Sequence, residues 1–185
     1  MNDFFDSDTS IEILATGFTW SEGPVWVPKL NGVLFSDVPE NRAYLWTKKL
    51  GLEVFLDPSG YTGYTTSIKK GGSNGLALDQ KGNLILCQQG DRRIAMFNQW
   101  ESKSPKFETI VDRFETKRFS SPNDLVISKD GSIFFTDPPY GLKEKNKDSL
   151  KELDYNGVYK WSPNGCVTLI NGELTRPNGI ELSLD

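Results

Sequence analysis

Hydrophobic residues along the chain occur in short runs, many of them alternating with polar residues, and Gly, Pro, Asn or Asp separates one run from the next. Short runs rich in β-branched and aromatic residues predict β-strands rather than helices. The runs fall into three groups of four, and a further run starts a fourth group. They cover residues 25–27, 33–36, 43–46 and 53–56, then 76–78, 84–87, 94–97 and 107–111, then 125–127, 133–136, 158–161 and 166–170, and finally 180–184.

Tight turns join the first two strands of the later groups. Lys81-Gly82-Asn83 and Asp130-Gly131-Ser132 place glycine where a hairpin requires it. Four antiparallel strands in a unit of about 40–50 residues are typical of a β-propeller blade. We therefore expect an all-β chain that forms one β-propeller domain over residues 1–185 and supplies about three and a half blades. The expected blades are residues 16–60, 72–112, 122–171 and, incompletely, 177–185.

A short motif recurs at the start of each group. Its copies read Ser-Glu-Gly-Pro-Val-Trp-Val from Ser21, Ser-Asn-Gly-Leu-Ala-Leu-Asp from Ser73, Pro-Asn-Asp-Leu-Val-Ile-Ser from Pro122 and Pro-Asn-Gly-Ile-Glu-Leu-Ser from Pro177. The second residues, Glu22, Asn74, Asn123 and Asn178, are 52, 49 and 55 residues apart. Because the first strand of each blade lies innermost, these side chains are expected to converge near one axis. Carboxylate and amide oxygens together suit a hard divalent cation.

Each motif residue also has a simpler interpretation. Glu22 could cap a turn, and Asn123 and Asn178 could be turn residues, because Asn tolerates the left-handed conformation. Recurrence at blade spacing favours a shared axial site for these three residues. For Asn74, in Gly-Gly-Ser-Asn-Gly, a plain turn and a place in the axial site both stay open.

Further candidates follow the second strand of each group, where the chain emerges on the same face. They are Asp37, the segment Gln88-Gln89-Gly90-Asp91, and Asp137 in Thr-Asp-Pro-Pro-Tyr-Gly. Tyr140, behind two prolines, could stack on a ring-shaped substrate. A rigid turn that ends the strand explains the Asp137 segment equally well.

Composition excludes several classes of function. A net charge of -4 argues against a general nucleic-acid binder, and no apolar run approaches the length of a membrane span, ~20 residues. The chain contains no histidine, which excludes Ser-His-Asp and Cys-His nucleophile systems and the usual His-based zinc sites. Two cysteines, Cys87 and Cys166, are too few for a disulfide framework, and we expect unpaired thiols on strands.

Three segments lie outside the regular pattern. Residues 138–156 interrupt the third group, and a solvated insertion with a short helix is favoured over a flap covering the channel mouth. Residues 11–15 are predicted to form a strand that completes the last blade. Residues 180–185 fall within an innermost strand, so we expect either a C-terminally truncated sequence or an assembly completed by a second chain, and self-association through the unpaired edge at residues 180–184. The acidic N-terminus lacks the layout of a signal peptide, which favours the cytoplasm, or the periplasm if a leader was removed.

Four motifs, in this order and spacing, resemble the gluconolactonase / senescence-marker-protein-30 family. They are Glu22-Gly23-Pro24-Val25-Trp26, Ser121-Pro122-Asn123-Asp124, Thr136-Asp137-Pro138-Pro139-Tyr140-Gly141 and Arg176-Pro177-Asn178-Gly179. The resemblance covers essentially the whole chain. It implies a six-bladed propeller with a divalent metal near its axis, calcium or else zinc, and hydrolysis of sugar lactones or related esters.

The resemblance also implies roles for individual residues. Glu22, Asn178 and Asn123 match metal ligands, Asn123 also matches a substrate contact, and Asn74 and Tyr140 are further candidates for substrate binding. An Asp ligand at the start of a fifth blade is implied beyond residue 185, which leaves Asp137 as the candidate base within this chain. Ser121 stands where some relatives place an Arg that grips a sugar, so that mode of sugar recognition is not expected.

The leading hypothesis is therefore a metal-dependent lactonase or esterase that acts on a small molecule and uses neither nucleic acid nor membrane. The cation would polarise the carbonyl and activate water. A phosphotriesterase with the same ligands, a non-catalytic ligand-binding propeller and an inactive fragment are the alternatives.

Overall fold

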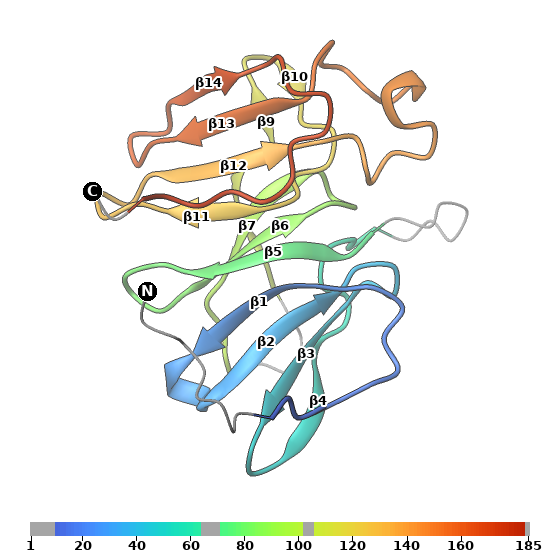
Figure 1. Cartoon of the computed structure of the whole chain (residues 1–185). Coiled ribbons are helices and arrows are strands. Elements are labelled where there is room, and N and C mark those ends of the chain that lie inside the picture. The colour runs from blue at the N-terminus through green and yellow to red at the C-terminus, as the bar shows by residue number, and fades with distance from the viewer. Residues whose placement is uncertain (1–9, 64–70, 102–105, 184–185) are drawn as a thin grey trace.

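The computed structural model describes residues 10–63, 71–101 and 106–183, which contain three four-stranded antiparallel sheets (Figure 1). The first sheet is β1 (Ser21–Val27), β2 (Gly32–Asp37), β3 (Arg42–Thr47) and β4 (Gly51–Leu56). The second is β5 (Ser73–Leu78), β6 (Leu84–Gln88), β7 (Arg93–Phe97) and β8 (Glu108–Val111). The third is β11 (Leu125–Ile127), β12 (Ile133–Asp137), β13 (Gly157–Trp161) and β14 (Val167–Asn171). The predicted all-β class is confirmed, and so are the strands of the first three groups, with some ends shifted.

Each sheet keeps its strands in sequence order, so neighbouring strands are joined by hairpins. The predicted glycine turns are present, with Gly82 at φ 79° and Gly131 at φ 82°. In the second sheet, the Gly82 amide donates to the Asp79 carbonyl over 2.9 Å, and the Asn83 amide donates to Asp79 Oδ1 over 2.8 Å. A short acidic residue before the glycine therefore fixes the turn and the register of its hairpin.

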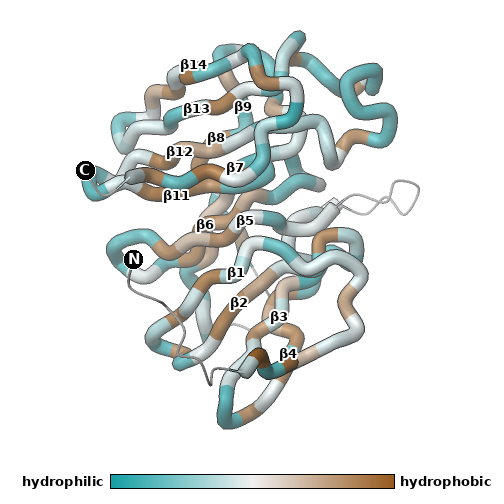
Figure 2. Tube along the Cα trace, in the orientation of Figure 1, coloured by the Kyte–Doolittle hydropathy of each residue, from teal (hydrophilic) through white to brown (hydrophobic). Residues whose placement is uncertain are grey.

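The hydrophobic core lies between the sheets. One buried cluster joins the first sheet, through residues such as Val27 and Leu34, to Leu84, Leu86 and Phe97 of the second. Another joins the opposite face of the second sheet to the third, where Phe119, Phe135 and Tyr159 pack together. Figure 2 shows hydrophobic residues concentrated in the strands and hydrophilic ones in the turns and the insertion.

The second sheet is therefore buried on both faces. In β6, Leu84 and Leu86 face the first sheet, whereas Ile85 and Cys87 face the third. This explains why the strand reads as a continuous apolar run, Leu-Ile-Leu-Cys, rather than as an alternating one.

Two predicted strands are wrong for the part of the chain that the structure describes. Residues 11–15 form no ladder, and the side chains of Ile11 and Ile13 are 97% and 77% exposed. Residues 180–183 also form no ladder, although this C-terminal segment runs beside β11 in Figure 1. A strand is held by backbone pairing with a neighbour, and neither segment has such a neighbour among the described residues.

Smaller elements lie around the sheets. The sequence pattern missed a short hairpin of β9 (Arg113–Phe114) and β10 (Lys117–Arg118), in which Glu115 adopts φ 55°. The turns η1 (Pro28–Leu30) and η2 (Lys145–Lys147) are 3-10 helices, and η2 is the short helix expected in the insertion. Within the described ranges, no helix is long and apolar enough to cross a membrane.

Candidate functional site

In the first two sheets, the repeated motif begins the first strand with an irregularity. The pairing of β1 with β2 shifts register between Glu22 and Val25, and that of β5 with β6 shifts between Ser73 and Leu76. A β-bulge of this kind turns a side chain away from the regular strand directions. Gly23 supports the first bulge with φ 57°, a conformation that favours glycine.

The four motif copies lie side by side at one end of the sheets. Three hydrogen bonds to the backbone of the motif asparagines join consecutive copies; two of them link neighbouring sheets, and the third links the third sheet to the C-terminal segment. They run from Ser36 Oγ to Asn74 O (2.9 Å), from Gly75 N to Asn123 O (2.7 Å) and from Thr136 Oγ1 to Asn178 O (2.7 Å). The backbones of consecutive motif copies are therefore neighbours in the fold, and convergence of their side chains on one axis stays a prediction.

Glycine permits this close approach between copies. A Cβ atom on Gly23 would lie 2.3 Å from the Asn74 carbonyl oxygen, and one on Gly75 would lie 2.5 Å from Asp124 Oδ1. Real Cβ atoms essentially never lie closer than 3.0 Å to such neighbours. Glycine after Glu22 and Asn74 therefore serves packing between sheets as well as turn geometry.

Asp124 is a member of the site that the sequence reasoning missed. Its Oδ1 accepts from the Leu125 amide over 2.9 Å, and its Oδ2 accepts from the Ile180 amide over 3.1 Å. Burial raises the pKa of Asp124, the two amide bonds oppose that shift, and the negative charges of Glu22 and Glu181 raise the pKa further. The sequence did contain a signal for Asp124: it is the third residue of its motif copy, and the other three copies have glycine at that position.

Asn123 has an unsatisfied acceptor. Its side chain is 3% exposed, and its Oδ1 is buried without a hydrogen-bond partner. A buried carbonyl oxygen that lacks a donor is uncommon in folded proteins and indicates a missing ligand, ion or water.

The other motif residues differ in exposure. Asn74 is buried, Glu22 is partly exposed and Asn178 is exposed. Glu22 Oε1 accepts from Trp20 Nε1 over 2.7 Å. The site thus has a buried amide side at Asn74 and Asn123 and an open acidic side at Glu22.

Asp137, the candidate base, makes structural contacts. Its side chain is fully buried, and its two oxygens accept from the Ser120 and Ser121 amides, each over 2.7 Å. Burial raises the pKa of Asp137 to about 7, against the opposing effects of those two amides and of Lys151 and Arg92. A carboxylate enclosed in this way positions the segment before Asn123 rather than contacting a substrate.

Asp37 holds the equivalent place in the first sheet. Its Oδ2 accepts from the Thr19 amide over 3.0 Å, and its Oδ1 accepts from the Trp20 amide over 2.9 Å. Each of these aspartates therefore fixes the backbone just before a motif copy.

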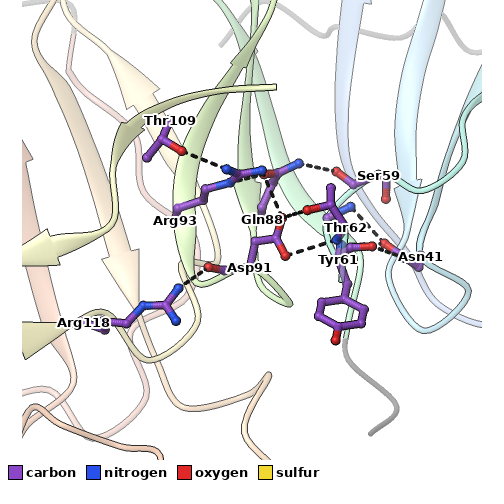
Figure 3. A network of polar contacts seen from close by, with 10 residues as sticks. Asn41, Ser59, Tyr61, Thr62, Gln88, Asp91, Arg93, Thr109 and Arg118 are labelled. Atoms are coloured by element: carbon purple, nitrogen blue, oxygen red, sulfur yellow. Dashed lines mark hydrogen bonds and ion pairs between the residues drawn. The ribbon is translucent and has the colours of Figure 1, made fainter. Parts of the chain in front are cut away.

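The candidate segment 88–91 also has structural contacts (Figure 3). Asp91 Oδ2 accepts from Thr62 Oγ1 over 2.7 Å and from Arg93 Nη2 over 3.0 Å. Gln88 Nε2 donates to the Ser59 carbonyl over 2.9 Å. These bonds fasten the connection between the first two sheets onto the second sheet, so Gln88 and Asp91 hold the scaffold of the site.

The insertion lies against the same end of the sheets. Ser121 Oγ donates to the Pro138 carbonyl over 2.6 Å and accepts from the Gly141 amide over 2.8 Å. Tyr140 is partly buried, and its carbonyl accepts from Lys145 Nζ. Its role in stacking on a substrate stays a prediction.

Carboxylates alone do not make a metal site in the described ranges, which contain no group of three or more His, Cys, Asp or Glu side chains suited to an ion. Oxygens from Asn123 and Asn178 would have to join Glu22. Such a mixed set is hard and weakly charged, which suits Ca²⁺ better than Zn²⁺.

The comparisons with known proteins agree with this arrangement of strands and motifs. The sequence profile of the SMP-30/Gluconolactonase/LRE-like region matches residues 20–185. The chain therefore belongs to the SMP-30/gluconolactonase family. It is 42% identical over 182 residues to a gluconolactonase of Zymomonas mobilis, a match that covers 97% of this chain and 50% of the relative.

Solved structures give the same picture. A candidate gluconolactonase superposes with a TM-score of 0.80 at 34% identity, over 95% of this chain and 56% of the other. A gluconolactonase of Xanthomonas campestris gives 0.72 at 30% identity, over 86% and 50%. Regucalcin of Agrobacterium tumefaciens, a calcium-binding protein, gives 0.55 at 12% identity and supports the fold alone. The chain spans about half the length of these relatives.

Proposed function

We propose that this chain carries part of the active site of a gluconolactonase-like hydrolase, which opens sugar lactones or related esters with the help of a divalent cation. The observation that carries the proposal is Asn123, whose buried Oδ1 has no donor and whose backbone lies in the row of motif copies that includes Glu22, Asn74 and Asn178. Family membership and the similarity to gluconolactonases support the reaction class.

The donor set fits a hard cation. Glu22 supplies a carboxylate, and Asn123 and Asn178 supply amide oxygens that add no charge. Asp124 adds negative charge near these residues. We do not count it as a ligand, because each of its two oxygens already accepts a hydrogen bond from a backbone amide. We propose calcium as the first candidate and zinc as the second.

When bound, the cation would polarise the lactone carbonyl and lower the pKa of a bound water. The residues of this chain would hold and orient the reactants. The Asn74 and Asn123 amides would contact the substrate on the buried side, while Glu22 would face the open side. Asp137 would keep the Asn123 segment in place through the Ser120 and Ser121 amides. We further propose that the sheets described here belong to a six-bladed propeller.

The direct test replaces Glu22 with Gln and measures calcium affinity by calorimetry and glucono-lactone hydrolysis by titration of the released acid. We expect calcium binding to weaken by at least ~10–100-fold. That is the usual loss when a residue hydrogen-bonded to a metal ligand is replaced, and replacing the ligand itself should cost at least as much. Hydrolysis, if the unsubstituted chain shows it, should fall in parallel.

Glu53→Gln is the matched control, because Glu53 is an exposed carboxylate on the outer strand β4. It should bind calcium as the unsubstituted chain does. Equal calcium affinity in both variants would contradict the proposed ligand set. Calcium binding that depends on Glu22 but supports no turnover would favour a ligand-binding protein over a hydrolase.

A further inference from the structure

A cavity of about 240 Å³ lies beside the motif row, between the loop after β6 and the insertion. The loop contributes Gln89, Gly90 and Arg92, and the insertion contributes residues 141–144 and 148–150. Gly141 makes the approach possible, since a Cβ there would lie 2.8 Å from Ser121 Cβ and 3.3 Å from Gln89 Cβ. The cavity therefore adjoins the segment that leads into Asn123.

Two buried donors in this wall have no acceptor. Gln89 Nε2 and Arg92 Nη2 lack hydrogen-bond partners, and the two side chains are 4% and 6% exposed. The carboxylate paired with Arg92 Nη2 is Glu152, whose Oε1 lies 3.9 Å away, beyond hydrogen-bonding distance. Arg92 Nε is already used, because it donates to the Phe119 carbonyl over 2.6 Å. Buried donors without acceptors are costly, so these two indicate a ligand that supplies acceptors.

The nearby acceptors are engaged elsewhere. Both oxygens of Asp148 accept from backbone amides, those of Glu144 and Leu150. Glu152 Oε2 accepts from the Arg118 amide over 2.8 Å. The two oxygens of Asp137 are held by Ser120 and Ser121.

Charges of both signs surround Arg92. Burial lowers the pKa of Arg92 and the nearby Arg118 lowers it further, whereas the charges of Glu152, Asp137 and Asp148 raise it. Arg118 Nε is also buried without an acceptor. Lys143 and Glu144, the remaining charged residues of the wall, are exposed and of opposite sign. A cation cannot use N–H donors, and an apolar ligand would leave them unsatisfied.

We propose that this cavity binds a small oxyanion, a carboxylate or phosphate group, held by Gln89 Nε2 and Arg92 Nη2. Such a group offers two or three strong acceptor oxygens, and hydrogen bonds between charged partners are the stronger kind. The proposal does not depend on the hydrolase function, because the anion could be free or could be carried by a ligand that extends to the motif row.

The test titrates the whole 185-residue chain with inorganic phosphate at constant ionic strength, measures affinity by calorimetry in every variant, and follows the Gln89 side-chain amide of the unsubstituted chain by NMR. Saturable binding is expected. Gln89→Glu should weaken it by about tenfold or more, since a donor is replaced by a negative charge. Gln99→Glu makes the same charge change at an exposed position after β7 and should leave phosphate affinity unchanged. Equal weakening in both variants, or a non-saturating response in the unsubstituted chain, would overturn the proposal.

Gluconate and 6-phosphogluconate identify the source of the anion. If 6-phosphogluconate binds about tenfold more tightly than phosphate, and Gln89→Glu removes that advantage, the oxyanion belongs to a sugar-sized ligand. If the phosphate and 6-phosphogluconate affinities are equal, the cavity takes a free anion. Failure of all three compounds to shift the Gln89 amide would refute the site.

Discussion

Gly75 donates its amide to the carbonyl oxygen of Asn123 over 2.7 Å, and this bond joins the second and third copies of the motif. The contact brings two backbones together without an intervening side chain. Asn123, with its unsatisfied amide oxygen, is therefore placed by a neighbouring sheet as well as by its own.

Gly75→Ala is predicted to destabilise the protein by roughly 1–3 kcal/mol, the usual range for overpacking a close contact. The added Cβ would lie 2.5 Å from Asp124 Oδ1 and 2.8 Å from Asp124 Cα, so backbone must move. Gly179→Ala is the matched control at the same motif position, because its Cβ would meet only Asp124 Oδ2, at 3.8 Å. Urea unfolding of both variants provides the comparison. An equal loss of stability in the two would contradict the role assigned to the close approach.

Thr136→Val should loosen the fourth motif copy. The substitution keeps the side-chain shape but removes the donor to the Asn178 carbonyl and the acceptor for the Asp124 amide. We expect a loss of about 1–3 kcal/mol, the cost of unsatisfied buried groups. Amide exchange at Ile180, which is held by Asp124, should become faster. Thr168→Val, on the exposed side of β14, should change stability by less than ~0.5 kcal/mol. Unchanged exchange at Ile180 in Thr136→Val would contradict this account.

The strands and hairpins were predictable because their signals are local. Alternation, β-branched residues and glycines such as Gly82 act within a few residues of one another. The repeat spacing also predicted the row of motif copies, because equivalent positions in repeated units become neighbours. The strand predicted at residues 11–15 does not form, because a strand also needs a pairing partner, and the segment's own sequence does not show whether that partner is present.

The roles of the aspartates could not be assigned from sequence. Asp137 and Asp37 look the same whether they face a substrate or a backbone, and only the folded chain shows the Ser120 and Ser121 amides directed at Asp137. Asp124 was missed for the opposite reason. It resembles a turn residue, and its charge matters only because Glu22 and Glu181 lie near it in space.

The two thiols should react at very different rates. Cys166 is exposed, whereas Cys87 is fully buried between the second and third sheets, where burial raises its pKa and the charges of Asp124 and Asp137 add to the shift. An aromatic disulfide reagent should titrate one thiol in the native chain and two in denaturant, since the thiolate is the reactive form. Cys166→Ser should abolish the fast phase and Cys87→Ser should retain it. Two fast thiols in the native protein would show that the packing around β6 is wrong.

Asp137 should make stability depend on pH in a direction unusual for an aspartate. The ordinary pKa of Asp is 3.8, and burial raises the pKa of Asp137 to about 7 in the folded chain. Between these values the folded state binds more protons than the unfolded state, so the contribution of Asp137 to stability decreases as pH rises. Relative to Asp137→Asn, which does not titrate, the unsubstituted chain should be more favoured at pH 5 than at pH 8. Urea unfolding at both pH values measures that difference.

Asp130→Asn provides the control for this pH dependence. Hydrogen bonds from Ser128 and Ser132 lower the pKa of the exposed Asp130 to about 2, so its stabilising contribution is lost only as pH falls through that value. Between pH 5 and 8 Asp130 is ionised in both the folded and unfolded states, so the stability difference caused by Asp130→Asn should be constant. If the difference caused by Asp137→Asn were equally constant over this range, the buried carboxyl group would be ionised throughout, stabilised by the Ser120 and Ser121 amides and the charges of Lys151 and Arg92. The raised pKa, and with it the pH-dependent loss of stability, would then be refuted.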